Sequence, residues 1–203
     1  MAPVETTLIL SSGFILGLSH AFEVDHLTAV SAFVALKPKP KQALKFGVHW
    51  AVGHGFSLLL FGSILFGLKL AVSDAWSHLL ERIVGAALFA VGLFMFWKLG
   101  RGLAKPHKHE HRGSIVMGML HGLAGTAAFV GQAFVVAAQS YSHVVGFTLA
   151  FSLGVLCSMA VYAHILGKVL VATQNQSRQL SRSVQVFTAL WTCGVGAFWM
   201  LRV

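Results

Sequence analysis

A run of 55 residues without Asp, Glu, Lys or Arg occupies positions 113–167 and reads GSIVMGMLHGLAGTAAFVGQAFVVAAQSYSHVVGFTLAFSLGVLCSMAVYAHILG. A helix needs about 20 mostly apolar residues to cross a lipid bilayer, so this run is too long for one crossing. The polar cluster Gln-Ser-Tyr-Ser-His at residues 139–143 divides the run into two. The run therefore predicts two successive transmembrane helices.

The rest of the chain repeats this pattern of apolar blocks between charges. Of the 203 residues, 56% are hydrophobic and only 10% are charged, whereas about 25% of the residues in a soluble domain are charged. The mean hydropathy is +0.76. These values exclude an ordinary soluble enzyme and a disordered tail. Further apolar blocks occupy residues 6–36, interrupted by Glu23 and Asp25, and residues 46–68, 83–97 (extendable to 79–99) and 183–201. We therefore expect an all-α polytopic membrane protein with six transmembrane helices in one domain, 1–203.

Basic residues are concentrated in alternate loops of this arrangement. The chain has 15 Lys and Arg against 6 Asp and Glu, a formal net charge of +9. Twelve of the 15 basic residues follow the first, third and fifth apolar blocks; they are Lys37, Lys39, Lys41, Lys45, Lys98, Arg101, Lys105, Lys108, Arg112, Lys168, Arg178 and Arg182. The positive-inside rule places these loops in the cytoplasm. We therefore expect a bacterial inner (plasma) membrane protein with both termini outside the cytoplasm, and no nucleic-acid partner.

A short motif recurs at an offset of 101 residues. Gly-Leu-Ser-His at residues 17–20 resembles Gly-Met-Leu-His at residues 118–121, and the same offset relates Gly53 to Gly154. Three crossings per unit would give two halves of opposite orientation, as in many secondary transporters. The alternative is chance agreement among Gly-rich apolar helices. The halves would cover residues 4–99 and 114–203, with a cytoplasmic His-rich loop at residues 100–113.

Ionisable side chains inside the apolar blocks gather in the first two blocks. Such groups are costly in lipid and are therefore functional hypotheses. The first block contains His20, Glu23, Asp25 and His26, the second contains His49 and His54, and His121 and His164 follow. Neutral imidazole suits Ni, Cu, Zn and Fe(II), and a carboxylate offsets part of the charge of a divalent ion. We predict a metal site formed by His20, Asp25, His26, His49, His54 and His121. A lone histidine such as His143 or His164 is more often a packing residue.

The spacing of these groups predicts an irregular first helix. An intact α-helix turns about 100° per residue, which puts His20 about 140° from Asp25 and about 120° from His26. No single helix face presents all three side chains. If they bind one ion, the backbone must unwind or bulge near residues 21–24. A membrane tolerates irregular backbone where it lines a cavity.

The same residues resemble a known family. The pattern His-x4-Asp-His, formed by His20, Asp25 and His26, is similar to the signature of the nickel/cobalt permeases, and Gly53-His54 resembles the second Gly-His motif of that family. Residues 121–127, His-Gly-Leu-Ala-Gly-Thr-Ala, are similar to a stretch of its small, urease-accessory-like transmembrane branch. The resemblance implies movement of Ni(II) or Co(II) across a membrane, with metal selection by the first motif. This chain departs from the family in two ways: Gly55 replaces a common hydroxyl residue, and six crossings replace the eight of the best-known permeases.

We therefore expect a transporter without enzymatic activity or a prosthetic group, whose metal cargo binds transiently. The chain contains no Walker motif, so energy would come from an ion gradient or a partner. Two alternatives use the same residue types: an intramembrane metal-dependent enzyme and a proton-coupled transporter with a His/Asp relay. The metal could also be zinc or copper. His107, His109 and His111 form a loop that either collects metal or is simply solvated. Gly-rich helix faces are compatible with a homo-oligomer, and a metal-handling partner protein is equally compatible.

Overall fold

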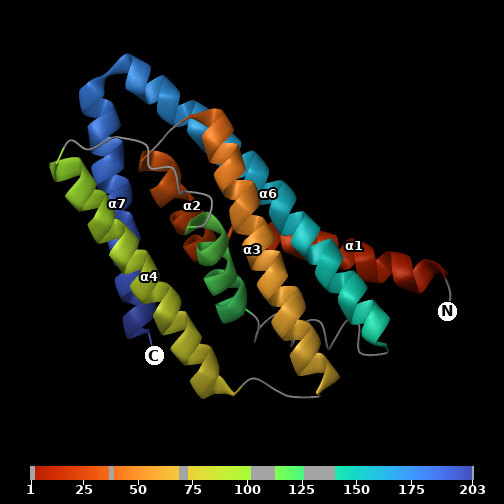
Figure 1. Cartoon of the computed structure of the whole chain (residues 1–203). Coiled ribbons are helices and arrows are strands. Elements are labelled where there is room, and N and C mark those ends of the chain that lie inside the picture. Colours follow the sequence, from red (N-terminus) through yellow and green to blue (C-terminus); the bar gives the residue numbers. More distant parts are fainter. Residues whose placement is uncertain (1–2, 37–38, 69–72, 102–112, 126–139, 203) are drawn as a thin grey trace.

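The computed structural model describes residues 3–36, 39–68, 73–101, 113–125 and 140–202, and within these ranges the regular elements are all helices. The helices are α1 (Pro3–His20), α2 (Val24–Leu36), α3 (Pro40–Gly67), α4 (Asp74–Gly100), α6 (Tyr141–Gln176) and α7 (Arg178–Leu201). A shorter apolar helix covers Gly113–Gly125 and is the green helix in Figure 1. The prediction of an all-α protein is confirmed for the described residues.

Most of these helices are suited to a bilayer. Helices α3, α4, α6 and α7 are each long and apolar enough to cross a membrane, and α1 and α2 together form a fifth candidate that is bent by 58° at its break. The described residues thus contain four candidate crossings, or five with the bent pair, against the six predicted. The missing crossing was predicted to begin at residue 113, and its continuation through residues 126–139 lies outside the described residues. Residues 102–112, which make up most of the His-rich loop predicted at 100–113, also lie outside them. The chain is a helical membrane protein for which the count of six stays a prediction.

Local capping explains where the long helices begin and end. Pro40 occupies the first turn of α3, where its missing N–H is not needed for a helical hydrogen bond. The hydroxyl of Ser140 accepts a hydrogen bond from the backbone N–H of His143 at the start of α6. Ser177 ends α6 and also begins α7, where its hydroxyl accepts from the N–H of Leu180. Helices α3 and α7 begin several residues before their apolar blocks, because Pro40 and Ser177, and not hydrophobicity, set their first residues.

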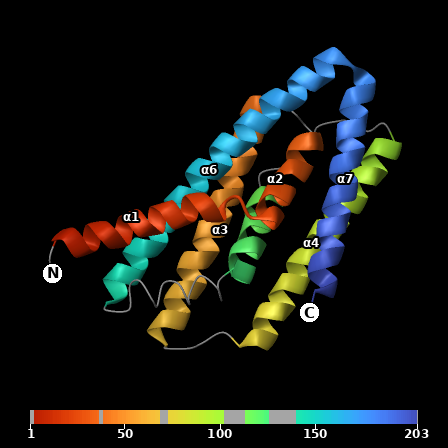
Figure 2. The same cartoon turned by 180° about the vertical axis from the view of Figure 1, so that it is seen from behind.

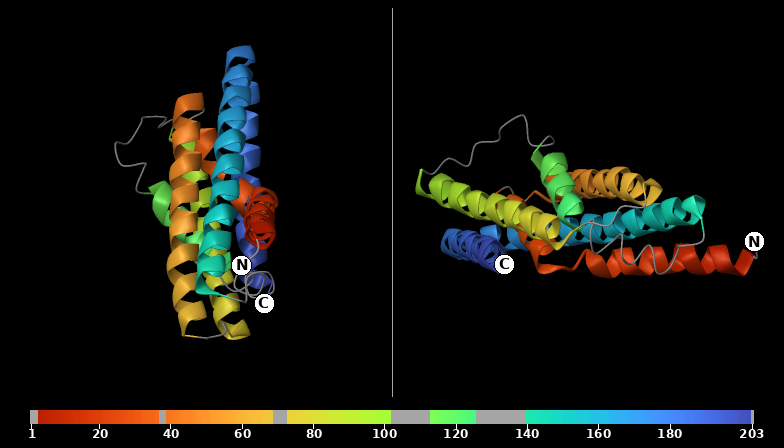
Figure 3. Two further views of the ribbon diagram at one scale, coloured as in Figure 1. Left: turned by 90° about the vertical axis from the view of Figure 1, so that its right-hand side faces the viewer. Right: turned by 90° about the horizontal axis from the view of Figure 1, so that it is seen from below.

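The helices pack mainly in three pairs: α3 with α6, α4 with α7, and α1 with α6. Figures 1 and 2 show α1 crossing α6 obliquely and extending away from the other helices at its N-terminal end. Two further views show α3 beside α6 along much of their lengths (Figure 3). Large apolar side chains such as Leu8, Leu60 and Val161 are exposed on the outer helix faces. A membrane protein places such side chains against lipid.

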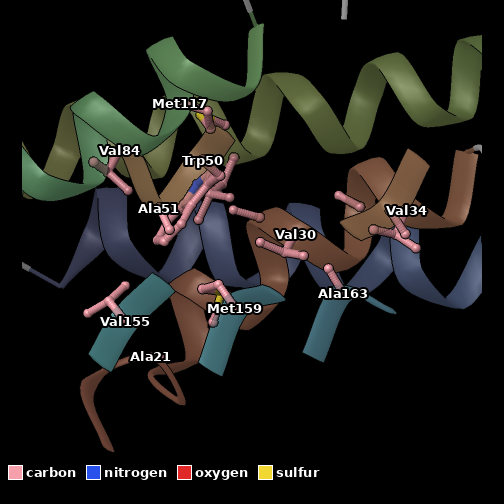
Figure 4. Close-up of a cluster of buried hydrophobic side chains, with 14 of the residues drawn as sticks. Ala21, Val30, Val34, Trp50, Ala51, Val84, Met117, Val155, Met159 and Ala163 are labelled. Atoms are coloured by element: carbon pink, nitrogen blue, oxygen red, sulfur yellow. The ribbon is translucent and has the colours of Figure 1, made fainter. Parts of the chain in front are cut away.

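The buried core surrounds α2, in which eight of 13 residues are buried. Figure 4 shows Val30 and Val34 of this helix in the same buried cluster as Trp50 of α3 and Met159 of α6. Polar contacts also hold α2 in place. The Trp191 Nε1–H of α7 donates to the Thr28 hydroxyl at 3.0 Å. The Gln185 side-chain amide donates to the Ala35 carbonyl at 3.0 Å, and the Ser31 and Tyr162 hydroxyls share a hydrogen bond of 2.6 Å. Because α2 is tied on several sides, its N-terminal residues have a defined position.

The sequence offset of 101 residues also relates two helix crossings. A Cβ atom on Gly17 would lie 2.0 Å from the carbonyl oxygen of Phe151, where α1 crosses α6. A Cβ atom on Gly118 would lie 1.9 Å from the carbonyl oxygen of Trp50, where the Gly113–Gly125 helix crosses α3. Glycine is required at both places because any side chain would collide with backbone. Trp50 and Phe151 are themselves 101 residues apart.

A second pair of glycine–carbonyl contacts at the same two crossings is related by the same offset of 101 residues. A Cβ atom on Gly154 would lie 2.3 Å from the carbonyl oxygen of Phe14, and one on Gly53 would lie 2.2 Å from that of Ile115. Both the glycines and their carbonyl partners are separated by 101 residues. The crossing of α1 with α6 therefore has a counterpart, residue for residue, in the crossing of the Gly113–Gly125 helix with α3.

Candidate metal centre

The candidate site is built on the break between α1 and α2. Helix α1 ends at His20, α2 begins at Val24, and residues 21–23 form a turn. Within this turn the N–H of Phe22 donates to Ser19 and that of Glu23 donates to His20, each at 3.0 Å and three residues back. The irregular backbone predicted near residues 21–24 is confirmed. Its effect is to bring the rings of His20 and His26 to a centroid separation of 4.6 Å.

Three imidazoles from three helices, α1, α2 and α3, converge at this break. His20, His26 and His54 each offer a ring nitrogen, and these nitrogens lie within 4.8 Å of one another. The ring of His54, on α3, lies 5.0 Å from His26 and 5.5 Å from His20 between centroids. Metal–nitrogen bonds are about 2.0–2.1 Å long, so two nitrogens bound to one ion are at most about 4 Å apart. Small side-chain rotations would therefore allow the three imidazoles to hold one ion.

The buried nitrogens of this cluster lack hydrogen-bond partners among the described residues. His26 is 1% exposed and His54 is 0% exposed, and neither ring nitrogen of either residue has a partner. Asp25 Oδ1 lies 3.0 Å from His26 Nδ1, but these neighbouring side chains do not meet with the angles of a hydrogen bond. Leaving a buried polar group unpaired costs about 1–3 kcal/mol. A bound cation is one way to satisfy these nitrogens, whereas simple packing leaves the cost uncompensated.

His121 and Trp50 complete the wall of the site. The buried ring of His121 lies 5.6 Å from that of His26, and its Nδ1–H donates to the Met117 carbonyl at 2.8 Å. This bond fixes the orientation of the ring and leaves Nε2 as the nitrogen with a lone pair. The indole of Trp50 is stacked on His54 at 5.3 Å and meets His26 edge-on at 4.9 Å. An aromatic wall of this kind excludes water and holds the imidazoles in place.

The structure does not bring every predicted ligand to the site. The Nδ1–H of His49 donates to the Lys45 carbonyl at 2.6 Å on its own helix, and neither metal-ligating group of described residues includes His49. His49 and His54 are five residues apart on α3, and this offset turns the side chain of His49 about 140° away from that of His54 around the helix axis. His143 and His164 lie on α6, outside these groups, and each has one buried nitrogen without a partner among the described residues.

A residue that we did not include among the ligands does lie at the site. Glu23 Oε1 is 2.8 Å from His20 Nδ1. Glu23, Asp25 and His26 also form a second group whose ligand atoms lie within 4.8 Å of one another. The signal was present in the sequence, because Glu23 is a second carboxylate inside an apolar block. Only the turn at residues 21–23 aims it toward Asp25.

Two equivalent pairs of rings border this region. The ring of His20 lies 5.1 Å from that of Phe151, and the ring of His121 lies 5.5 Å from that of Trp50. Both histidines and both aromatic residues are separated by the same 101 residues. The cluster therefore lies between the two equivalent helix crossings.

The fold and this site together define a helical membrane protein with a buried group of histidines able to hold a metal ion. The chain is 29% identical over 205 residues to the urease accessory protein UreH of Bacillus sp. (strain TB-90), and the match covers 92% of this chain and 88% of the relative. No family model matches the chain. No solved structure matches it either.

Proposed function

We propose that this chain is a permease that carries divalent transition-metal ions, Ni(II) and/or Co(II), across the bacterial plasma membrane. The observation that carries the proposal is the convergence of His20, His26 and His54 at the break between α1 and α2, with ring nitrogens within 4.8 Å of one another. Asp25 and His121 adjoin this cluster and serve as further ligands or as charge and orientation partners. His49 has no part in the proposed site.

The chemistry of the donor set suits transient binding of such an ion. Neutral imidazoles favour Ni(II), Co(II), Cu(II) and Zn(II) over Mg(II) and Ca(II). Three imidazoles do not complete the coordination shell, so the ion keeps water or takes a carboxylate oxygen of Asp25. A transport site must bind well enough to admit the ion and weakly enough to release it. The name of the relative, urease accessory protein, implies nickel handling and supports nickel among these metals.

The equivalent crossings support a movement for this transport. Many secondary transporters rock one half against the other around a site between them. In this chain the proposed halves, residues 4–99 and 114–203, meet at glycines packed directly on backbone carbonyls. Smooth contacts of this kind permit close helix packing in lipid. The proposed site lies between the crossings, so rocking would open it to one side at a time.

Flux measured in proteoliposomes tests the proposal. We expect the full chain to carry Ni(II) or Co(II) when Ni(II), Co(II), Zn(II) and Cu(II) are compared. The His26→Ala variant should insert normally but carry none of these ions, whereas the His164→Ala variant should resemble the parent. Undiminished flux by His26→Ala, or no flux of any ion by the parent, would overturn the proposal. Proton flux without metal flux would favour the relay, and catalytic turnover without flux would favour an intramembrane enzyme.

A further inference from the structure

A cavity of about 880 Å³ lies between the start of α2 and the C-terminal half of α7. Its wall on α7 is largely aromatic and includes Phe187, Trp191 and Phe198. Its wall on the other side contains the two carboxylates at the helix break, Glu23 and Asp25. The cavity therefore joins the C-terminal end of α7 to the edge of the histidine cluster.

Exposure falls steadily from this cavity toward the cluster. The side chain of Glu23 is 55% exposed, that of Asp25 is 11% exposed, and that of His26 is 2% exposed. Their ligand atoms lie within 4.8 Å of one another, and His26 also belongs to the group with His20 and His54. Asp25 as a whole is more than nine-tenths buried, and its Oδ1 has no hydrogen-bond partner among the described residues. The neighbour of this oxygen is the His26 ring at 3.0 Å, and a buried carboxylate oxygen without a hydrogen bond at the wall of a cavity is a ready ligand for a cation.

The order of donor types matches the loss of water by an entering ion. A hydrated divalent ion first meets carboxylate oxygens, which are hard ligands that tolerate bound water. The deeper group then offers imidazole nitrogens, which suit late transition metals better. The cationic group in the cavity lining, Arg202, lies over the rings of Phe198 and Trp199. The carboxylates at the inner end of the cavity therefore give that end its negative charge.

We infer that Glu23, Asp25 and His26 form an outer cation site that captures divalent metal from this cavity and passes it to His20, His26 and His54. His26 is common to both ligand groups, so one ion occupies one group at a time and exchanges one set of ligands for the other. Glu23 and Asp25 both belong to the outer group and not to the inner one, and of the two only Glu23 has no role in the proposed inner site. The inference rests on the proposed function only for the direction in which the ion is transferred. The outer site itself requires only that the chain binds a divalent metal ion there.

The chain offers a matched pair of substitutions for the test. Glu23 lies three residues after His20, and Glu81 lies three residues after His78 with side-chain atoms 3.9 Å apart. Glu23→Gln removes the charge and keeps an oxygen that can accept from His20 Nδ1. Glu81→Gln makes the same change far from the site in sequence. A third variant, Glu23→Ala, removes the acceptor as well.

The first measurement is binding of Co(II) to the purified full chain in detergent, followed by its absorption in stopped flow. We expect Glu23→Gln to slow association about ten-fold, as loss of local electrostatic attraction does, and to leave the final Co(II) spectrum unchanged. Glu81→Gln should match the parent. Equal association rates for Glu23→Gln and Glu81→Gln overturn the inference. If only Glu23→Ala is slow, the inference is also overturned, because Glu23 then serves only to position His20. A changed final Co(II) spectrum in Glu23→Gln also overturns the inference, because Glu23 would then bind the ion together with the three histidines in one shared site. Absence of Co(II) binding by the parent overturns both proposals.

The second measurement separates the outer site from transport. In proteoliposomes, Glu23→Gln should raise KM about ten-fold for Co(II) supplied on the side where α7 ends, with kcat unchanged, and should leave KM unchanged from the other side. Equal KM changes from both sides overturn the outer site even where flux is normal. If the parent binds Co(II) but carries no metal, the permease proposal fails, and the association rates still decide the outer site.

Discussion

The imidazole of His121 packs against the indole of Trp50 with ring centroids 5.5 Å apart. At the offset of 101 residues, His20 is the equivalent of His121 and Phe151 is the equivalent of Trp50. The rings of His20 and Phe151 also lie close together, with centroids 5.1 Å apart. A histidine from each of the two proposed halves, residues 4–99 and 114–203, thus meets an aromatic side chain of the other. Any motion between the halves would act directly on the surroundings of the proposed metal site.

Close packing at Gly118 should be essential to stability. A methyl group there would lie 1.9 Å from the Trp50 carbonyl oxygen, so Gly118→Ala forces backbone apart, and overpacking of this kind costs about 1–3 kcal/mol. We expect a lower Tm for the purified variant and weaker metal binding, because Trp50 and His54 follow the shift of α3. Thermal unfolding in detergent measures the first effect.

The matched control for this substitution is Gly194→Ala on α7. No described atom lies within 4 Å of a Cβ placed there, and replacing a helical glycine by alanine stabilises by about 0.4–1 kcal/mol where the space is free. Its Tm should therefore equal or exceed that of the parent. A Tm loss as large as that of Gly118→Ala would show that the two sites do not differ in packing.

His54 and His49 should differ sharply in their importance for metal. His54 belongs to the cluster of three imidazoles, and loss of even an outer partner of a metal ligand lowers affinity about 10–100-fold. We therefore expect His54→Ala to lower Co(II) or Ni(II) affinity at least about ten-fold and His49→Ala to leave it unchanged. Calorimetric titration of both variants measures this. Equal losses would return His49 to the site.

Trp50 should report metal binding by its fluorescence. Its indole is buried and lies within 5.3 Å of the rings of His26 and His54, and the open-shell ions Ni(II) and Co(II) quench nearby excited indoles. We expect metal to quench the fluorescence of the parent chain. The Trp50→Phe variant should lose most of this quenching and still bind metal by calorimetry. Full quenching in Trp50→Phe would place the ion nearer another tryptophan.

The asymmetry of basic residues predicts the orientation of the chain. Twelve of 15 Lys and Arg lie in alternate loops that should be cytoplasmic. Alkaline phosphatase fused after Val203 should therefore be active in the periplasm, and green fluorescent protein fused at the same point should be dark. A fluorescent protein inserted in the loop at residues 102–112 should fluoresce. The opposite pattern would invert the topology and assign the proposed outer site to the cytoplasmic face.

Hydropathy and residue spacing in the sequence were sufficient to predict the long membrane helices and the break in the first of them. Runs of apolar residues must form helices in lipid because every backbone group needs an internal hydrogen-bond partner, so α3, α4, α6 and α7 follow from hydropathy. The break at residues 21–23 also followed, because His20, Asp25 and His26 cannot share one face of a straight helix. Helix ends did not follow from hydropathy, since Pro40, Ser140 and Ser177 decide them by capping.

The sequence by itself determined that this chain is a helical membrane protein and that its ionisable groups gather in the first two apolar blocks; it predicted a break in the first helix on the hypothesis that His20, Asp25 and His26 bind one ion. Only the tertiary structure decided which of those groups meet. His54 lies within reach of His20 and His26 while His49 does not, and Glu23 joins Asp25 at the cavity. The physical reason is that hydropathy and spacing fix which residues a helix presents together, whereas its rotation toward its neighbours depends on packing such as that of Gly17 on Phe151 and Gly118 on Trp50. Those contacts join residues more than 60 positions apart, and no local pattern encodes them.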